Sequence, residues 1–107
     1  MSSEEKYCLS DVRALFENSL GIITESATQG AWAQKFTPED IKHVIMKELD
    51  ASHFYKSMEA DKCPGLWQDV YKLKFLEVPL YIKLQIRDGK RGRRAVVISF
   101  KLDESFR

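Results

Sequence analysis

The chain has 107 residues, of which 44% are hydrophobic and 31% charged, and its formal net charge is +1. This composition suits one globular domain over residues 1–107 without disulfides or metals, and its near-neutral total gives no sign of a nucleic-acid partner. No apolar run reaches the length of a membrane span and the polar N-terminus differs from a signal peptide, so we expect a soluble, cytoplasmic protein without membrane contact.

The first part of the chain is predicted to be helical. An apolar stripe predicts a helix over Ser10–Leu20, which begins at a capping serine and is ended by Gly21. Residues 22–24 are a candidate short strand. Residues 29–35 are ambiguous, but we expect Trp32 in that stretch to belong to the core.

A second helix is predicted to begin at Thr37. Threonine can cap a helix, Pro38 fits the first helical position, and two acidic residues follow. Its buried face is expected to consist of four aliphatic residues: Ile41, Val44, Ile45 and Leu49. His43 lies beside this face, where we expect a partly exposed histidine.

The second half of the chain is predicted to form strands. After a short helical turn within residues 50–62, strands are predicted over Trp67–Val78, Leu80–Arg87 and Ala95–Leu102, with a turn at Pro79. Helices followed by a strand meander indicate an α+β fold, in which N-terminal helices pack on one face of a C-terminal antiparallel β-sheet.

The last two predicted strands can be aligned by their alternating pattern. Folding residues 88–94 symmetrically about Arg91 pairs aliphatic residues throughout: Leu80 with Leu102, Ile82 with Phe100, Leu84 with Ile98 and Ile86 with Val96. The alternative is a tight turn at Asp88–Gly89, which would place aliphatic residues of one strand opposite arginines of the other. The favoured register places Tyr81 opposite Lys101 on the face away from the core. Such a pair can bind phosphate and transfer protons, but an ordinary exposed pair has the same pattern.

Charge is distributed unevenly along the chain. Residues 1–66 hold 7 Lys and Arg against 11 Asp and Glu, whereas residues 67–107 hold 10 against 5, which gives balances of −4 and +5. The basic half can bind a polyanion or can be a solvated strand face. Lys83 and Arg87 on the polar strand face are candidate substrate contacts. The basic loop at residues 88–94 could likewise grip phosphate or be only a soluble hairpin tip.

Signatures of several site classes are missing. Cys8 and Cys63 are far apart, and with His43 and His53 they lack metal-ligand spacing. We expect two buried or half-buried free thiols in a reducing cytosol. No glycine-rich nucleotide motif, phosphate loop or hydrolase signature is present, so we expect neither metal nor cofactor.

Four blocks in this order resemble the motility quorum-sensing regulator family of toxins. They read FYKSM at 54–58, WQDVY at 67–71, LYIKL at 80–84 and ISFK at 98–101, and lie within roughly residues 52–102. The family is similar in fold to the RelE-like toxins, which are compact α+β ribonucleases. The resemblance implies a type II toxin that cuts single-stranded mRNA independently of ribosomes, with a preference involving G–C steps. The products expected of metal-free cleavage are 2′,3′-cyclic phosphate and 5′-hydroxyl ends.

By position, the resemblance implies four catalytic and substrate-binding residues: Lys56, Gln68, Tyr81 and Lys101. Tyr55 and Met58 lie beside them as candidate substrate contacts. For Tyr55 we favour facing RNA, whereas for Met58, as for Phe54 and Trp67, packing is the stronger interpretation. His53, just before this block, is an outside candidate for proton transfer, although a surface histidine is the favoured interpretation.

The resemblance also implies a cognate antitoxin protein that inhibits the toxin and binds operator DNA, so that the toxin meets DNA only indirectly. Two features depart from the family pattern, namely a longer basic loop before the last strand and a tail over residues 103–107. The alternative function is a non-catalytic module that uses the same basic sheet to bind RNA or a protein partner.

Overall fold

The computed structural model describes residues 4–60 and 63–105, and the side chains of residues 63 and 64 are excepted. Within these residues the helical elements are α1 (Leu9–Glu17), α2 (Glu25–Ala33), α3 (Pro38–His43), a π-helical turn (Val44–Glu48) and a 3-10 turn (Ala51–His53). The strands are β1 (Gly21–Ile23), β2 (Phe54–Ala60), β3 (Cys63–Phe75), β4 (Val78–Gly89) and β5 (Gly92–Leu102). Each described helix is too short or too polar to cross a membrane.

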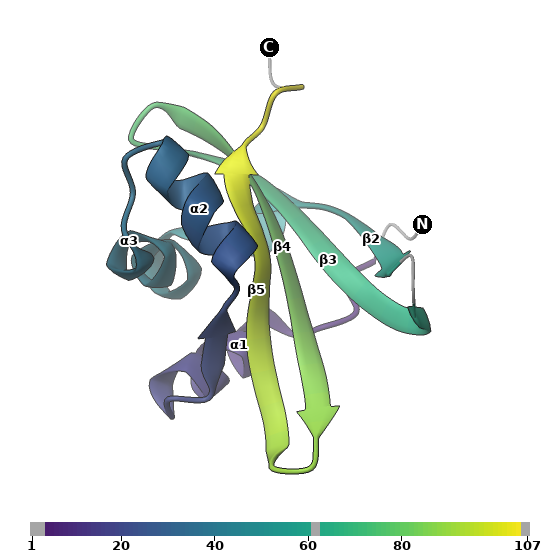
Figure 1. The fold of residues 1–107 in the computed structure, drawn as a ribbon. Coiled ribbons are helices and arrows are strands. Elements are labelled where there is room, and N and C mark those ends of the chain that lie inside the picture. The colour runs from purple at the N-terminus through teal and green to yellow at the C-terminus, as the bar shows by residue number, and fades with distance from the viewer. Residues whose placement is uncertain (1–3, 61–62, 106–107) are drawn as a thin grey trace.

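The strands form one sheet in the order β1-β5-β4-β3-β2, with the helices on one of its faces (Figure 1). Strands β2 to β5 pair antiparallel, as expected, but β1 lies parallel to β5. The α+β class is therefore confirmed, and the sheet is mixed rather than purely antiparallel.

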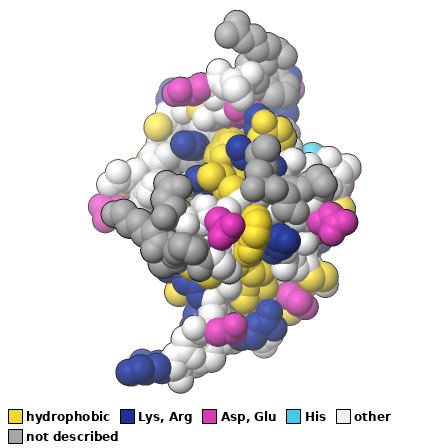
Figure 2. All heavy atoms as spheres, turned by 90° about the vertical axis from the view of Figure 1, so that its right-hand side faces the viewer, with side chains coloured by type: hydrophobic (Ala, Val, Ile, Leu, Met, Phe, Trp, Pro, Cys, Tyr) yellow, Lys and Arg dark blue, Asp and Glu magenta, His cyan; other side chains and the backbone are white. Residues whose placement is uncertain are grey.

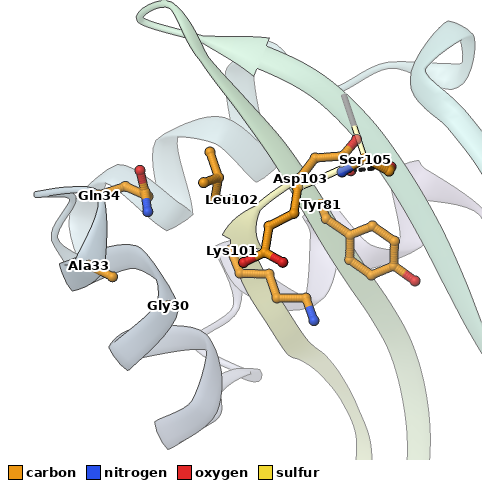
Figure 3. A pocket seen from close by; sticks show the side chains of 9 residues that line it. Gly30, Ala33, Gln34, Tyr81, Lys101, Leu102, Asp103 and Ser105 are labelled. Atoms are coloured by element: carbon orange, nitrogen blue, oxygen red, sulfur yellow. Dashed lines mark hydrogen bonds between the residues drawn. The ribbon is translucent and has the colours of Figure 1, made fainter. Parts of the chain in front are cut away.

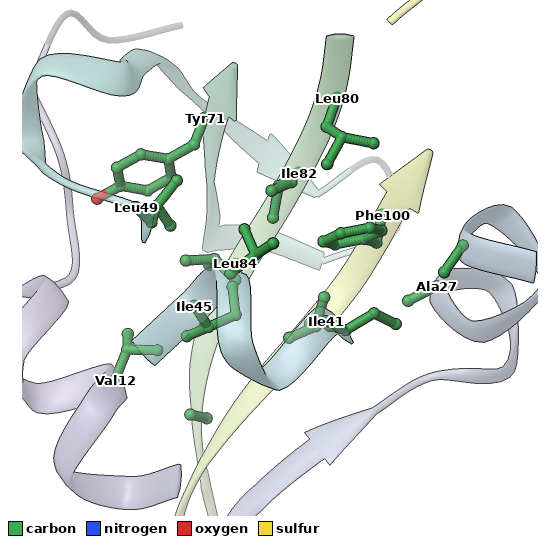
Figure 4. Close-up of a cluster of buried hydrophobic side chains, with 14 of the residues drawn as sticks. Val12, Ala27, Ile41, Ile45, Leu49, Tyr71, Leu80, Ile82, Leu84 and Phe100 are labelled. Carbon is green, nitrogen blue, oxygen red and sulfur yellow. The ribbon is translucent and has the colours of Figure 1, made fainter. Parts of the chain in front are cut away.

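A single cluster of buried side chains joins the helices to the sheet (Figure 4). The four residues predicted for the buried helix face are all at most 1% exposed. His43 is exposed, as expected. The predicted cap at Thr37 is present, and the structure adds a reciprocal bond from the Asp40 side chain that completes a capping box.

Helix α2 lies unusually close to β5. A Cβ atom added at Gly30 would lie 2.4 Å from the Phe100 carbonyl oxygen, and Ala27 and Ala31 are fully buried. This small face leaves Trp32 on the outside of the helix, where it is 61% exposed. The prediction that Trp32 belongs to the core is wrong, because the helix uses its alanines to approach the sheet.

The first helix differs from prediction at both ends. It begins after Cys8, and Gly21 starts β1 instead of ending the helix. A Cβ atom at Gly21 would collide with the Phe16 ring at 2.2 Å, so the glycine is needed for packing. Cys8 is exposed, which corrects the expected burial, and its Sγ lies 2.9 Å from Ser10 Oγ. The side chain of Cys63 lies outside the described residues.

The predicted helical turn at residues 50–62 is wrong for its larger part. Among the described residues of this range only Ala51–His53 form a helical turn, and the chain then enters β2, which pairs with β3. Residues 61 and 62 lie outside the described part of the chain. Phe54 packs edge-to-face on Tyr71, with ring centroids 5.7 Å apart. A short apolar run does not identify a strand by itself, and here pairing with a neighbouring strand decides the conformation.

The β3–β4 hairpin turns at Leu76 and Glu77 instead of Pro79. Both residues have positive φ, 49° and 69°, as the two central residues of a type I′ turn require. Asparagine and glycine usually occupy such turns. Pro79 lies in β4 opposite Lys74, and its carbonyl accepts the Asp103 N–H at 2.9 Å.

The β4–β5 register is confirmed near Tyr81 and wrong farther out. Tyr81 lies opposite Lys101, flanked by the predicted pairs Leu80–Leu102 and Ile82–Phe100. A bulge at Ile98 then shifts the pairing by one residue, so that Leu84 faces Val97 and Ile86 faces Ala95. Strand β4 continues to Gly89 and β5 begins at Gly92, so most of the predicted loop at residues 88–94 belongs to the two strands.

The N-terminal segment is fastened to β3 by a buried carboxylate. Asp69 is fully buried and accepts the N–H groups of Lys6 and Tyr7, each at 2.9 Å, while Tyr7 Oη donates to the Trp67 carbonyl. We expect Asp69→Ala to lower the free energy of unfolding by about 2–3 kcal/mol, because charged hydrogen bonds are lost and N–H groups are left unpaired. Urea denaturation measures this change. Asp88→Ala, at an exposed carboxylate, is the matched control, and equal stability of the two variants would contradict the role of Asp69.

Candidate functional site

The sheet face opposite the helices carries the predicted catalytic residues. Alternation along the strands, together with a bulge at Tyr55, places a group of cationic and phenolic side chains there, which we call the lysine–tyrosine cluster: Tyr55, Lys56, Lys72, Tyr81, Lys83 and Lys101. These residues come from four adjacent strands, so the sheet itself fixes their spacing.

Tyr81 is at the centre of the cluster. It lies opposite Lys72 on one neighbouring strand and opposite Lys101 on the other. The Nζ atoms of Lys101, Lys83 and Lys72 lie 5.3, 5.9 and 6.0 Å from its ring centroid. These distances are typical of cation–π contacts, and they gather positive charge around a single phenol.

A bulge brings Tyr55 into the cluster. Consecutive strand residues normally point to opposite faces, but the β2–β3 pairing shifts between Phe54 and Lys56. As a result Lys56 Nζ lies 5.4 Å from the Tyr55 ring centroid and Lys72 Nζ lies 4.1 Å from it. Tyr55 is 52% exposed, so its ring is available to stack on a base.

Lys72 was missed by the sequence analysis and is held in the cluster by an ion pair and a hydrogen bond. Its Nζ lies 3.4 Å from Asp103 Oδ2 and donates to Ser105 Oγ at 3.1 Å. Asp103 is itself buried, and its Oδ1 accepts the N–H and hydroxyl of Ser105. The tail after β5 therefore holds Lys72 between the two tyrosine rings. A turn predicted at residues 76–77 would have placed Lys72 opposite Tyr81.

The surroundings set opposite protonation states for Tyr81 and Asp103. Burial, followed by the negative potentials of Tyr55 and Asp103, raises the pKa of Tyr81, so it remains a protonated phenol at neutral pH. Burial alone would raise the pKa of Asp103. Hydrogen bonds from Ser105 and Lys72 outweigh that effect and lower the Asp103 pKa below 3.8, so this residue is a carboxylate.

The lowered pKa of Asp103 predicts a pH-dependent contribution to stability. A carboxyl group with a lower pKa in the folded than in the unfolded state stabilises the fold above the unfolded value, and this stabilisation is lost as pH falls through the folded pKa. We expect wild type to be more stable than Asp103→Asn at pH 6 and the difference to shrink below pH 3.8. Denaturation at a series of pH values measures it. A difference independent of pH would show that the charge of Asp103 is not responsible.

The other residues predicted for the site lie partly on the cluster's face of the sheet and partly outside the cluster. Lys56 lies opposite Val70 and Met58 opposite half-buried Gln68, so all of them share the cluster's face. Met58 and Trp67 are half-buried outside the main core, whereas Phe54 packs against it. Arg87 is six residues beyond Tyr81, on the order of 20 Å along the strand, and is not part of the cluster.

The two histidines and Cys8, whose side chains the structure describes, form no metal site beside the cluster. The Nδ1 atom of His53 accepts the Asp50 N–H at 3.1 Å, inside its own turn. Among the residues that the structure describes, no three His, Cys, Asp or Glu side chains are grouped closely enough to hold a metal ion. The chemistry offered by the cluster itself is anion binding by ammonium groups next to a protonated phenol.

A pocket of about 380 Å³ adjoins the cluster, between α2 and the end of β5 (Figure 3). Tyr81 and Lys101 line its sheet side, Ala33 and Gln34 its helix side, and Asp103 its end.

The sequence matches a model of a known protein family. The family model described as the motility quorum-sensing regulator, toxin of MqsA, matches residues 4–102, including the helical half outside the four blocks. A search of curated proteins gives no match. Because the family model covers nearly the whole chain, the protein belongs to the motility quorum-sensing regulator family and is a toxin of a toxin–antitoxin system with an antitoxin as partner.

Proposed function

We propose that the protein is an endoribonuclease that cleaves single-stranded mRNA without a metal ion and thereby inhibits translation. The observation that carries the proposal is the protonated Tyr81 phenol with three lysine Nζ atoms within 6.0 Å of its ring centroid. Phosphodiester cleavage by the neighbouring 2′-hydroxyl needs a base, cations around the phosphate and an acid for the leaving oxygen. Phenol and amine groups can supply all three.

In the proposed step, one lysine of the cluster first releases its own proton to water, and the ribose 2′-oxygen then attacks phosphorus as its proton passes to that amine. The bond between phosphorus and the 5′-oxygen breaks, and that oxygen takes the proton of Tyr81. The products are a 2′,3′-cyclic phosphate and a 5′-hydroxyl end. We assign Tyr81 as the acid because its phenol holds a proton at neutral pH and lies among the lysines that would bind the phosphate.

The other residues of the face then bind and orient RNA. Lys56 and Lys101 stabilise the charge that develops on the phosphate, and Gln68 orients the ribose or phosphate. Tyr55, Met58 and Lys83 contact the substrate on either side, and the pocket beside Tyr81 accepts one base. We retain the preference for G–C steps, the cytoplasmic location and the contact with operator DNA through the antitoxin as parts of this proposal.

One experiment separates cleavage from simple binding. Purified protein is mixed with single-stranded RNA in EDTA, and the ends of any fragments are identified. Fragments ending in cyclic phosphate, with cut sites mapped against G–C steps, are the expected result. Intact RNA that is retarded in a gel would contradict the nuclease proposal and favour an RNA-binding module.

A further inference from the structure

The outer part of the β4–β5 hairpin carries a second concentration of positive charge. It extends beyond the helices (Figure 1), and Lys and Arg side chains gather at its far end (Figure 2). Residues 87–94 include five cations: Arg87, Lys90, Arg91, Arg93 and Arg94. Their one acidic neighbour in that range, Asp88, lies 3.7 Å from Arg93. The outer hairpin therefore keeps a large excess of positive charge.

Strand pairing places part of this charge on the same sheet face as the lysine–tyrosine cluster. Along β4, every second residue from Tyr81 shares that face, which leads to Gln85 and Arg87. Arg87 lies opposite Arg94 in the strand pairing, and its Nε donates to Gln85 Oε1, so the Arg87 and Gln85 side chains lie together on this face. The Asp88–Arg93 pair occupies the opposite face.

The guanidinium groups on this face are partly fixed by the hairpin itself. Arg94 donates to the carbonyls of Arg91 and Arg93 at 3.1 and 2.9 Å, which holds it at the turn. Lys90 and Arg91 form the turn and are exposed. A strand rise of about 3.3 Å per residue puts the Arg87–Arg94 pair on the order of 20 Å from Tyr81.

We propose that Arg87, Lys90, Arg91 and Arg94 form a second backbone-binding surface for RNA, which holds the strand several nucleotides away from the bond that is cut. The inference rests on the proposed function, because it says where the part of the same RNA that lies far from the cut bond is bound. A protein partner is less well matched, since residues 87–94 contain no aromatic or aliphatic side chain to form the core of an interface. Closely spaced cations on one face, at Arg87 and Arg94, and at the adjoining turn, at Lys90 and Arg91, match successive phosphates.

The test compares two triple variants of equal charge. Lys90→Gln, Arg91→Gln and Arg94→Gln are combined in the hairpin, and Lys35→Gln, Lys42→Gln and Lys47→Gln on the exposed helical side serve as the control. Binding is measured by fluorescence anisotropy with 2′-O-methyl RNA, which cannot be cleaved, of about 4 and about 16 nucleotides. Thermal melting of each variant checks that the fold is kept.

For the long RNA we expect the hairpin variant to lose affinity by roughly tenfold or more, and the salt dependence of log affinity to flatten by about 0.7 per lost phosphate contact. The short RNA, which cannot reach the hairpin from Tyr81, is expected to bind equally well to all three proteins. Equal losses for both RNA lengths, no loss at all, or an effect on antitoxin binding alone would overturn the inference.

These outcomes are distinguishable from failure of the proposed function. If wild type leaves a cleavable RNA intact while the length-dependent loss is observed, the nuclease proposal fails and the hairpin surface stands. If wild type cleaves and the hairpin variant binds both RNAs normally, cleavage stands and the hairpin surface is rejected.

Discussion

Replacing Tyr81 with phenylalanine is expected to slow RNA cleavage by roughly 100-fold or more, the effect of losing a general acid. The substitution removes one hydroxyl group from a half-buried side chain, so the ring can still contact the Nζ atoms of Lys72, Lys83 and Lys101. RNA affinity and thermal stability should therefore stay close to those of wild type. The measurement is the single-turnover cleavage rate at saturating protein.

Tyr71→Phe provides the matched control for this prediction. Tyr71 lies on the same sheet but is buried on the helical side, where burial raises its pKa to about 12. Its hydroxyl takes no part in the proposed step, so cleavage should continue at the wild-type rate. Wild-type cleavage by Tyr81→Phe would refute proton donation by Tyr81, and equal losses in both variants would point to a structural effect.

Lys56→Ala is expected to reduce the single-turnover rate by roughly 100-fold or more, the scale on which removal of one charge-stabilising donor acts. Lys56 lies in β2 directly after the bulge, and its Nζ lies 5.4 Å from the Tyr55 ring centroid. Its ammonium group can thus meet charge on a phosphate that is held against the sheet. Because the effect concerns the transition state, affinity for uncleavable RNA should change much less than the rate.

Two further variants sharpen the Lys56 prediction. Lys47→Ala removes an equal charge from an exposed site on the helical side and should leave cleavage unchanged. Lys56→Arg keeps the charge but changes its shape, and we expect it to restore part of the rate. A loss in Lys56→Ala that is confined to RNA affinity would assign Lys56 to substrate binding alone.

The position of Tyr81 beside Lys101 was predictable because aliphatic pairs flank it on both sides. The predicted turn was centred on Arg91, whereas the observed turn is Lys90–Arg91, half a residue earlier. The bulge at Ile98 adds one residue to β5 and offsets that error. The register is therefore correct near Tyr81 and wrong between the bulge and the turn.

The rest of the site depends on contacts that leave no local pattern. Strand β2 forms because β3 is available to pair with it, and the bulge that turns Tyr55 toward Lys72 belongs to that pairing. The turn at Leu76–Glu77 lacks the residues that usually signal one, so Lys72 was not aligned with Tyr81. Trp32 is outside because small residues set the distance between α2 and the sheet.

The bulge at Ile98 also separates two parts of the molecule that can change independently in evolution. On its inner side, the pairs around Tyr81 and Lys101 are fixed by the buried residues Leu80, Ile82 and Phe100. On its outer side, Ile86 and residues 95–97 are still buried, and only residues 87–93 at the end of the hairpin are exposed. Natural selection can therefore alter the length and charge of the hairpin tip while the proposed reaction chemistry stays constant.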